Sequence, residues 1–127
     1  MFVFSMYFMD IQNIKKDMFK NKNCIPCQGG IPPLNKNEIK KFKNLIRSDW
    51  LIIENIKLSK KFNFITYKHA IKFTNLVASL AEEQGHHPYI HINFKEIEIF
   101  IFTHKINGLH ENDFLMANKI DQIYLKL

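Results

Sequence analysis

The alternation of apolar and polar residues predicts three amphipathic helices joined by short strands. The longest helical pattern runs from His69 to Glu83, with apolar residues three and four positions apart and lysine and asparagine on the other side. Gly85 stands just past its end, where glycine commonly stops a helix. The last helix is predicted over Glu111 to Leu125. Its apolar stripe consists of Phe114, Ala117, Ile120 and Tyr124.

A shorter helix is predicted to begin after Asn35, a residue that can accept hydrogen bonds from the first helical turn. Glu38 stands three residues later, in the position of a capping box. The preceding segment, residues 24–34, holds two adjacent glycines and two adjacent prolines and cannot form regular structure. One face of the helical pattern carries Ile39, Phe42, Leu45 and Ile46.

Two strand pairs are predicted between these helices. The isoleucine-rich segment Trp50 to Leu58 predicts a strand, Lys60-Lys61 a turn, and residues 62–67 the returning strand. Trp50 is expected in the core.

Residues 89–94 and 96–103 alternate with period two on either side of Lys95, which predicts a hairpin. The element order is therefore α-β-β-α-β-β-α. We expect an α+β fold in which the helices pack on one face of a four-stranded antiparallel sheet.

A chain of 127 residues predicts a single domain, which we place at residues 24–127 after an amino-terminal extension, 1–23. The formal charge of +6 is carried almost wholly by scattered lysines, and Arg47 is the only arginine. Arginine is the usual residue for bidentate phosphate and guanine contacts, so nucleic acid is an improbable partner.

Two cysteines, Cys24 and Cys27, are too few for a disulfide framework, and a lone Cys-x-x-Cys is a weak metal or redox signal. We expect a structural or incidental role for them. No apolar run approaches 18 residues, so no membrane span is predicted. The short apolar start makes a poor signal peptide. These features predict a cytoplasmic location, with the nucleus as a second possibility.

Three of the six histidines, His86, His87 and His104, stand at the start and the end of the second predicted hairpin. Neighbouring strands of a hairpin run antiparallel, so the start of the third strand lies beside the end of the fourth. The three imidazoles should therefore meet at one edge of the sheet. Glu82 precedes them by one helical turn, and Asp113 opens the last helix. Histidines with acids at both ends indicate proton transfer on a small molecule.

Zinc is the main rival interpretation of this cluster, because zinc sites use three or four convergent ligands. Adjacent ligands on an extended chain converge poorly, so no metal is expected. His69, His91 and His110 are expected to be surface or capping residues. The alternative interpretation of Glu82 is a solvated helix residue. The alternative for Asp113 is an acid that only interacts favourably with the helix dipole at the start of the last helix.

The spacing resembles that of the pterin-4a-carbinolamine dehydratases. Glu82 and three further residues lead to His86-His87-Pro88; five more lead to Phe94, nine to His104 and eight to Asp113. The segment Cys-Ile-Pro-Cys-Gln-Gly-Gly-Ile-Pro-Pro-Leu also resembles many members. The resemblance covers roughly residues 24–125.

This resemblance implies a hydro-lyase that converts 4a-hydroxytetrahydropterin to quinonoid dihydropterin in tetrahydrobiopterin recycling, with no metal or cofactor. It implies that His86 and His104 are the acid and base, that His87 orients the pterin, and that Glu82 and Asp113 support the histidines. The pterin would be lined by Gly85, His86, His87, Pro88, Phe102, Thr103, His104 and Lys105. Departures from the family pattern are His110, where serine is common, and Lys105, where an acid is common.

The resemblance also implies a homodimer or homotetramer. Two other roles stay open. One is a dimerisation partner of a transcription factor, which would need an apolar patch on the last helix. The other is pterin binding in another pathway, such as molybdenum-cofactor metabolism.

Overall fold

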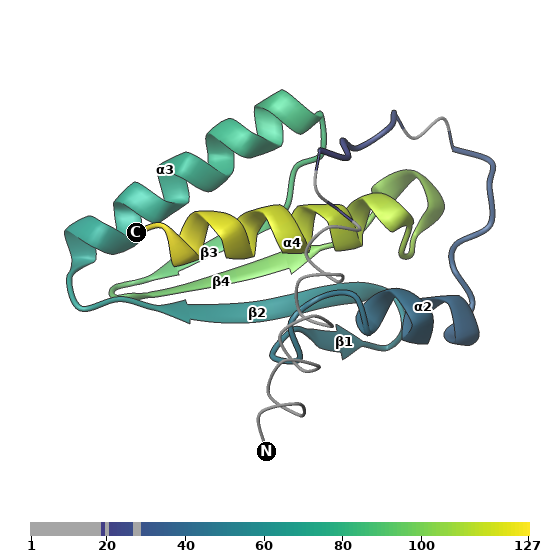
Figure 1. Cartoon of the computed structure of the whole chain (residues 1–127), viewed down its shortest axis with the longest axis horizontal. Helices are drawn as coiled ribbons and strands as arrows, with labels where there is room; N and C mark the ends of the chain where they lie inside the picture. The colour runs from purple at the N-terminus through teal and green to yellow at the C-terminus, as the bar shows by residue number, and fades with distance from the viewer. Residues whose placement is uncertain (1–18, 20, 27–28) are drawn as a thin grey trace, which may run out of the picture.

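The computed structural model describes residues 19, 21–26 and 29–127. It shows a four-stranded antiparallel sheet, ordered β1-β2-β4-β3, with α3 and α4 across one face and α2 packed against α4 (Figure 1). The elements are α2 (Lys36–Lys43), β1 (Leu51–Ile53), β2 (Lys57–Asn63), α3 (Tyr67–Gln84), β3 (Tyr89–Asn93), β4 (Glu96–Ile101), the 3-10 helix η1 (His104–Ile106) and α4 (Glu111–Leu125). The predicted α+β class and element order are confirmed. Within the described residues, no helix is long and apolar enough to cross a membrane.

Local sequence signals fix the ends of the helices. The Asn35 side chain accepts the Glu38 N–H at 2.9 Å, and the Glu38 carboxylate accepts the Asn35 N–H at 3.1 Å, which confirms the predicted capping box. The Thr66 hydroxyl accepts the His69 N–H and starts α3. Gly85 ends α3 in the left-handed region, at φ 63°. This left-handed residue turns the chain sharply towards β3.

The first hairpin is shorter than predicted. The segment Trp50 to Leu58 is not one strand, because Glu54 and Asn55 both have positive φ, at 52° and 57°. Two such residues in succession make the mirror-image turn that suits a tight hairpin, which is usually signalled by Asn-Gly. The sequence Glu-Asn lacks that glycine and therefore hid the turn.

The turn predicted at Lys60-Lys61 is consequently wrong, and so is a returning strand over residues 62–67. Both lysines lie within β2, which pairs with β1 on one side and β4 on the other. A lysine pair suggests a turn when only polarity is considered. Here strand alternation sends Lys61 to solvent and buries Lys60, whose charge is met by acidic partners.

The second hairpin matches its prediction closely. Phe94 and Lys95 form the two-residue turn between β3 and β4, with Phe94 at φ 52°. The β4 strand ends at Ile101 rather than at Thr103, because the chain then bends into η1. At the opposite end of the hairpin from this turn, the start of β3 lies beside the end of β4.

The core lies between the sheet and the helices. The three isoleucines of β4 that point to this side, Ile97, Ile99 and Ile101, are fully buried, and so is Phe73 of α3. Trp50 is 1% exposed, which confirms its predicted core position. Among the described residues no helix covers the other face of β4, and the side chains on that face are half-buried.

A buried ionic network ties β2 to α4. Lys60 Nζ lies 2.7 Å from Asp121 Oδ1, and the Trp50 indole N–H donates to Asp121 Oδ2 at 2.8 Å. Lys60 also reaches the exposed Asp49 at 2.9 Å. Burial raises the pKa of Asp121, although the hydrogen bonds from Lys60 and Trp50 act in the opposite sense. The carboxylate therefore depends on Lys60 to remain charged inside the protein.

Lys60→Met should destabilise the fold, because it leaves the Asp121 carboxylate buried without its cation. We expect the free energy of unfolding in urea to fall by about 3 kcal/mol. The double variant Lys60→Met/Asp121→Asn should recover much of that loss, since the amide oxygen can still accept the indole N–H. Lys61→Met, on the exposed side of the same strand, is the matched control. A double variant no more stable than Lys60→Met alone would contradict this account.

Candidate active site

The predicted site residues come from three chain segments that meet at the open end of the β3–β4 hairpin. Gly85, His86 and His87 connect α3 to β3, and His104 follows the end of β4 as the first residue of η1. Asp113 lies in the first turn of α4. The antiparallel pairing of β3 with β4 brings the first two segments to the same end of the sheet.

Asp113 is the centre of the hydrogen bonding here. Its Oδ1 lies 2.6 Å from His86 Nε2, and its Oδ2 accepts the Thr103 hydroxyl at 2.9 Å and the His110 N–H at 2.8 Å. The Asp113 side chain is fully buried, and that of His86 is 13% exposed. An ionised carboxylate can only accept, so His86 must donate through Nε2–H. In neutral His86 the free lone pair is then on Nδ1, the nitrogen that can take another proton.

His87 is held differently from His86. Its Nε2 lies 2.6 Å from Glu82 Oε1, at the end of α3. Both side chains are largely exposed, at 61% and 80%, so this pair contributes little to stability. Glu82 thus contacts His87, whereas Asp113 contacts His86.

His104 is exposed and is held by aromatic rings. Its imidazole lies 4.2 Å from the Phe102 ring and 5.4 Å from the Tyr89 ring, centroid to centroid. Within the described residues, no hydrogen bond or ring contact joins His104 to His86 or His87. The link is indirect: Thr103, the residue before His104, binds the same carboxylate as His86.

The remaining predicted lining residues lie around this end of the sheet. Pro88 is half-buried and Lys105 is exposed on η1. Gly108 and the proline segment pack closely, since a Cβ on Gly108 would lie 2.5 Å from the Pro33 Cβ. Leu34 N–H donates to the Leu109 carbonyl at 2.9 Å. The Pro-Pro-Leu segment therefore supports the loop that carries η1.

The other histidines take up the surface and capping positions predicted for them. His110 is the N-cap of α4: its Nδ1 accepts the Asn112 N–H at 3.1 Å, so a histidine does here what a serine hydroxyl can do. His69 is exposed in the first turn of α3. His91 is exposed on β3 against the Phe100 ring.

Sequence reasoning missed an N-terminal strap, residues 21–26, which crosses the ends of α3 and α4. Cys24 N–H donates to Gln84 Oε1 at 2.9 Å. Ile25 and the Asn112 side chain exchange two hydrogen bonds, at 3.0 and 2.6 Å, and Lys22 forms an ion pair with Glu111. The asparagine and glutamine side chains that bind the strap follow no periodic pattern in the sequence, so the strap was not predicted. The strap fixes the two helix ends that flank His86 and Asp113.

Cys24 lies within this strap and its thiol is half-buried. Burial raises the pKa of the Cys24 thiol to about 11, with Asp113 adding to the shift and Lys119 opposing it. A thiol that stays protonated is a weak nucleophile, and a structural or incidental role stays the prediction for Cys24. Cys27 lies outside the described residues. Among the residues that are described, no three His, Cys, Asp or Glu side chains gather as a metal site.

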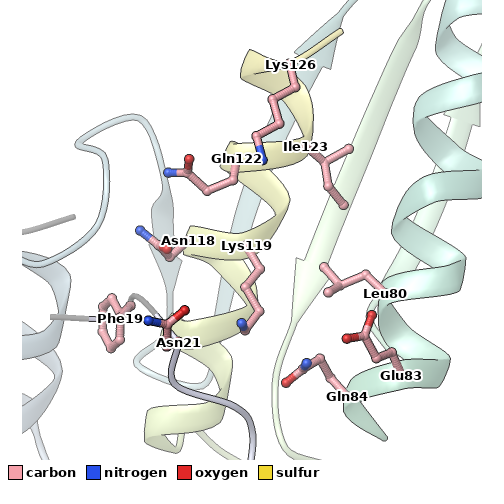
Figure 2. Close-up of a pocket in the computed structure, with 10 residues that line it drawn as sticks. All are labelled: Phe19, Asn21, Leu80, Glu83, Gln84, Asn118, Lys119, Gln122, Ile123 and Lys126. Atoms are coloured by element: carbon pink, nitrogen blue, oxygen red, sulfur yellow. The ribbon is translucent and has the colours of Figure 1, made fainter. Parts of the chain in front are cut away.

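A groove of about 310 Å³ lies between α3 and α4, apart from the histidines. Figure 2 shows Leu80 and Gln84 of α3 facing Lys119 and Ile123 of α4. Seven of its ten lining residues are polar, namely Asn21, Glu83, Gln84, Asn118, Lys119, Gln122 and Lys126, and the apolar ones are Phe19, Leu80 and Ile123.

Solved structures of similar shape include a transcriptional coactivator/pterin dehydratase from Brucella melitensis. It superposes with a TM-score of 0.68 and 25% identity, covering 72% of this chain and 98% of the other. A pterin dehydratase-like protein described as a RuBisCO assembly factor of the alpha-carboxysome has a TM-score of 0.53 at 24% identity, over 60% of this chain and 89% of its own. The fold is that of pterin dehydratases.

The sequence comparison agrees with this class. Residues 32–123 match the profile of the pterin 4 alpha carbinolamine dehydratase family. Relatives provisionally named pterin-4-alpha-carbinolamine dehydratase occur in Alkaliphilus metalliredigens, with 42% identity, and Rickettsia bellii, with 45%. Both alignments cover 80% of this chain, and 91% and 89% of those relatives. The chain belongs to the pterin-4a-carbinolamine dehydratase family of hydro-lyases.

Asp113→Asn should reverse the tautomer of His86. The amide oxygen can keep the Thr103 and His110 donors, which turns the amide NH₂ towards His86 Nε2 and moves the ring proton to Nδ1. We expect imidazole ¹⁵N spectra of neutral His86 to show Nε2–H in the wild type and Nδ1–H in the variant. The free energy of unfolding should fall by about 1–3 kcal/mol.

Glu82→Gln is the matched control, because it makes the same change on an exposed carboxylate. Its free energy of unfolding should change by less than about 0.5 kcal/mol, and the His86 spectrum should stay as in the wild type. An unchanged His86 tautomer in Asp113→Asn would show that the carboxylate does not set it.

Proposed function

We propose that the protein dehydrates 4a-hydroxytetrahydropterin to quinonoid dihydropterin in tetrahydrobiopterin recycling, with His86 and His104 as base and acid. The observation that carries this proposal is the buried Asp113 carboxylate bonded to His86 beside the segment that bears His104. The family membership supports the reaction class, and the site supports a histidine mechanism for it.

The reaction needs one proton given and one proton taken. The C4a–O bond breaks as the leaving hydroxyl receives a proton and departs as water. The N5 lone pair forms the new C4a=N5 double bond, and the N5 proton passes to a base. Hydroxide is a poor leaving group unless it is protonated. Each of the two proton transfers therefore raises the rate by roughly 10²–10⁴-fold.

His86 suits the role of base. A proton taken from N5 at its Nδ1 produces an imidazolium whose charge faces the Asp113 carboxylate at 2.6 Å. The resulting charge-assisted hydrogen bond would hold the imidazolium in place during the reaction. His104, which has no carboxylate partner among the described residues, is left as the acid for the departing hydroxyl.

The remaining site residues would bind the pterin rather than transfer protons. His87, whose Nε2 faces Glu82, is exposed at the same end of the hairpin, and in its neutral form its Nδ1 can accept a hydrogen bond from the pterin. Backbone from Gly85 to Pro88 and from Phe102 to Lys105 would line the planar ring. The position of the pterin relative to the two histidines matters, since a displacement of about 1 Å can lower the rate on the order of 10²-fold.

A homodimer or homotetramer is part of this proposal. Among the described strands, β3 lies at an edge of the sheet. Three large side chains of β3 and its turn are exposed: Tyr89 at 52%, Ile92 at 49% and Phe94 at 63%. Exposed apolar edge strands favour pairing with another chain. The alternative role as a transcription-factor partner has less support, because the α4 side of the groove is mostly polar.

Stopped-flow decay of enzymatically generated 4a-hydroxytetrahydropterin tests the function. Wild type should accelerate the decay, and His86→Ala/His104→Ala should return it to within a few-fold of the spontaneous rate. The control His69→Ala/His91→Ala removes two exposed histidines away from the site and should keep wild-type activity. His104→Ala alone should lower turnover far more than stability, because its ring is exposed. No acceleration by the wild type would refute the proposal.

Chelation provides a second test, since a histidine acid and base need no metal for this dehydration. Dialysis against EDTA should leave the stopped-flow rate unchanged. Inactivation by EDTA that zinc reverses would instead assign the histidines to a metal site.

A further inference from the structure

We propose that Tyr89 is a positioning residue that orients the His104 imidazole for proton transfer; this inference rests on the proposed dehydration. Tyr89 is the first residue of β3 and follows His87 by two positions. Its ring meets that of His104 edge to face, with centroids 5.4 Å apart and planes at 89°. The family spacing did not single it out.

The need for such a residue follows from how differently the histidines are held. His86 and His87 each have a carboxylate oxygen at 2.6 Å, which fixes the ring and its tautomer. The partners that the structure shows for His104 are rings. An exposed imidazole without a hydrogen-bonded partner would rotate among rotamers, and a rotated ring cannot deliver a proton to a fixed atom.

Three rings restrict this rotation by contacting one another. Phe102 lies 4.2 Å from His104, and Tyr89 lies 5.6 Å from Phe102 as well as 5.4 Å from His104. The edge-to-face arrangement of Tyr89 and His104 is a favoured geometry of aromatic pairs, and the planes of these two rings are tilted by 51° and 48° against that of Phe102. Phe102 comes from the same chain segment as His104, whereas Tyr89 comes from the segment that bears His86 and His87. Tyr89 is therefore the residue that sets His104 relative to the other two histidines.

Substitution of Tyr89 leaves the buried core intact because its side chain is 52% exposed, and the molar mass of each variant in solution shows whether the proposed pairing at the β3 edge is kept. Tyr67 is a matched control: it is 51% exposed and contacts Phe94 at 6.1 Å, beside the turn at the opposite end of the β3–β4 hairpin. Tyr89→Phe keeps the ring and removes the hydroxyl. Thermal unfolding of each variant shows whether it is folded.

We expect Tyr89→Ala to lower kcat about tenfold while KM changes less than about twofold, because only the orientation of the acid is lost. Tyr89→Phe and Tyr67→Ala should keep the wild-type kcat. In ¹H NMR spectra, the His104 ring protons should lose the ring-current shift of Tyr89 in the alanine variant alone.

Two results would overturn the inference while the dehydratase function stands. One is wild-type kcat in a folded Tyr89→Ala. The other is a raised KM at unchanged kcat, which would place Tyr89 against the substrate instead. A wild type that does not accelerate dehydration would remove the proposed function and this inference together, and the His104 NMR shift would then report only on the ring contact.

Discussion

The arrangement of this site depends on one buried carboxylate. Asp113 accepts hydrogen bonds from the side chain of His86, the hydroxyl of Thr103 and the backbone of His110. These donors belong to the entry of β3, the exit of β4 and the start of α4. A fully buried charge is costly unless several donors satisfy it, so the three segments are held together by the requirement to solvate Asp113. The same requirement fixes which nitrogen of His86 is free.

The second buried charge has a different role. Asp121, also on α4, is met by Lys60 of β2 and the Trp50 indole, at a distance from the histidines along the helix. The two aspartates thus attach the same helix to the sheet at two places. Asp113 sits where the helix begins and where protons are transferred in the proposed reaction, whereas Asp121 lies eight residues later and has only structural partners.

The sequence predicts most of the fold because its signals are local. The capping box of Asn35 and Glu38, the left-handed Gly85 and the period-two strands all act within a few residues. The prediction of the first hairpin was wrong for a physical reason. The turn at Glu54 and Asn55 lacks glycine, and nothing in the sequence indicates that Lys60 has a buried partner 61 residues away.

The site is predictable in part on the same grounds. Antiparallel pairing places the histidine segments together, and the spacing to Asp113 marks it as a candidate. Which acid meets which histidine depends on side-chain direction, which the spacing does not contain. The ring contacts of His104 and the hydrogen bonds of the N-terminal strap are tertiary contacts between residues distant in sequence.

The strap shows that the hydrogen-bonded structure and the family profile begin at different residues. The family profile begins at residue 32, yet Cys24 and Ile25 hydrogen-bond to Gln84 and Asn112, close in the sequence to the candidate site residues His86 and Asp113. The hydrogen-bonded structure therefore starts before the part that the family profile matches. A chain trimmed to residues 32–123 would keep every histidine and lose the contacts of the strap across the two helix ends.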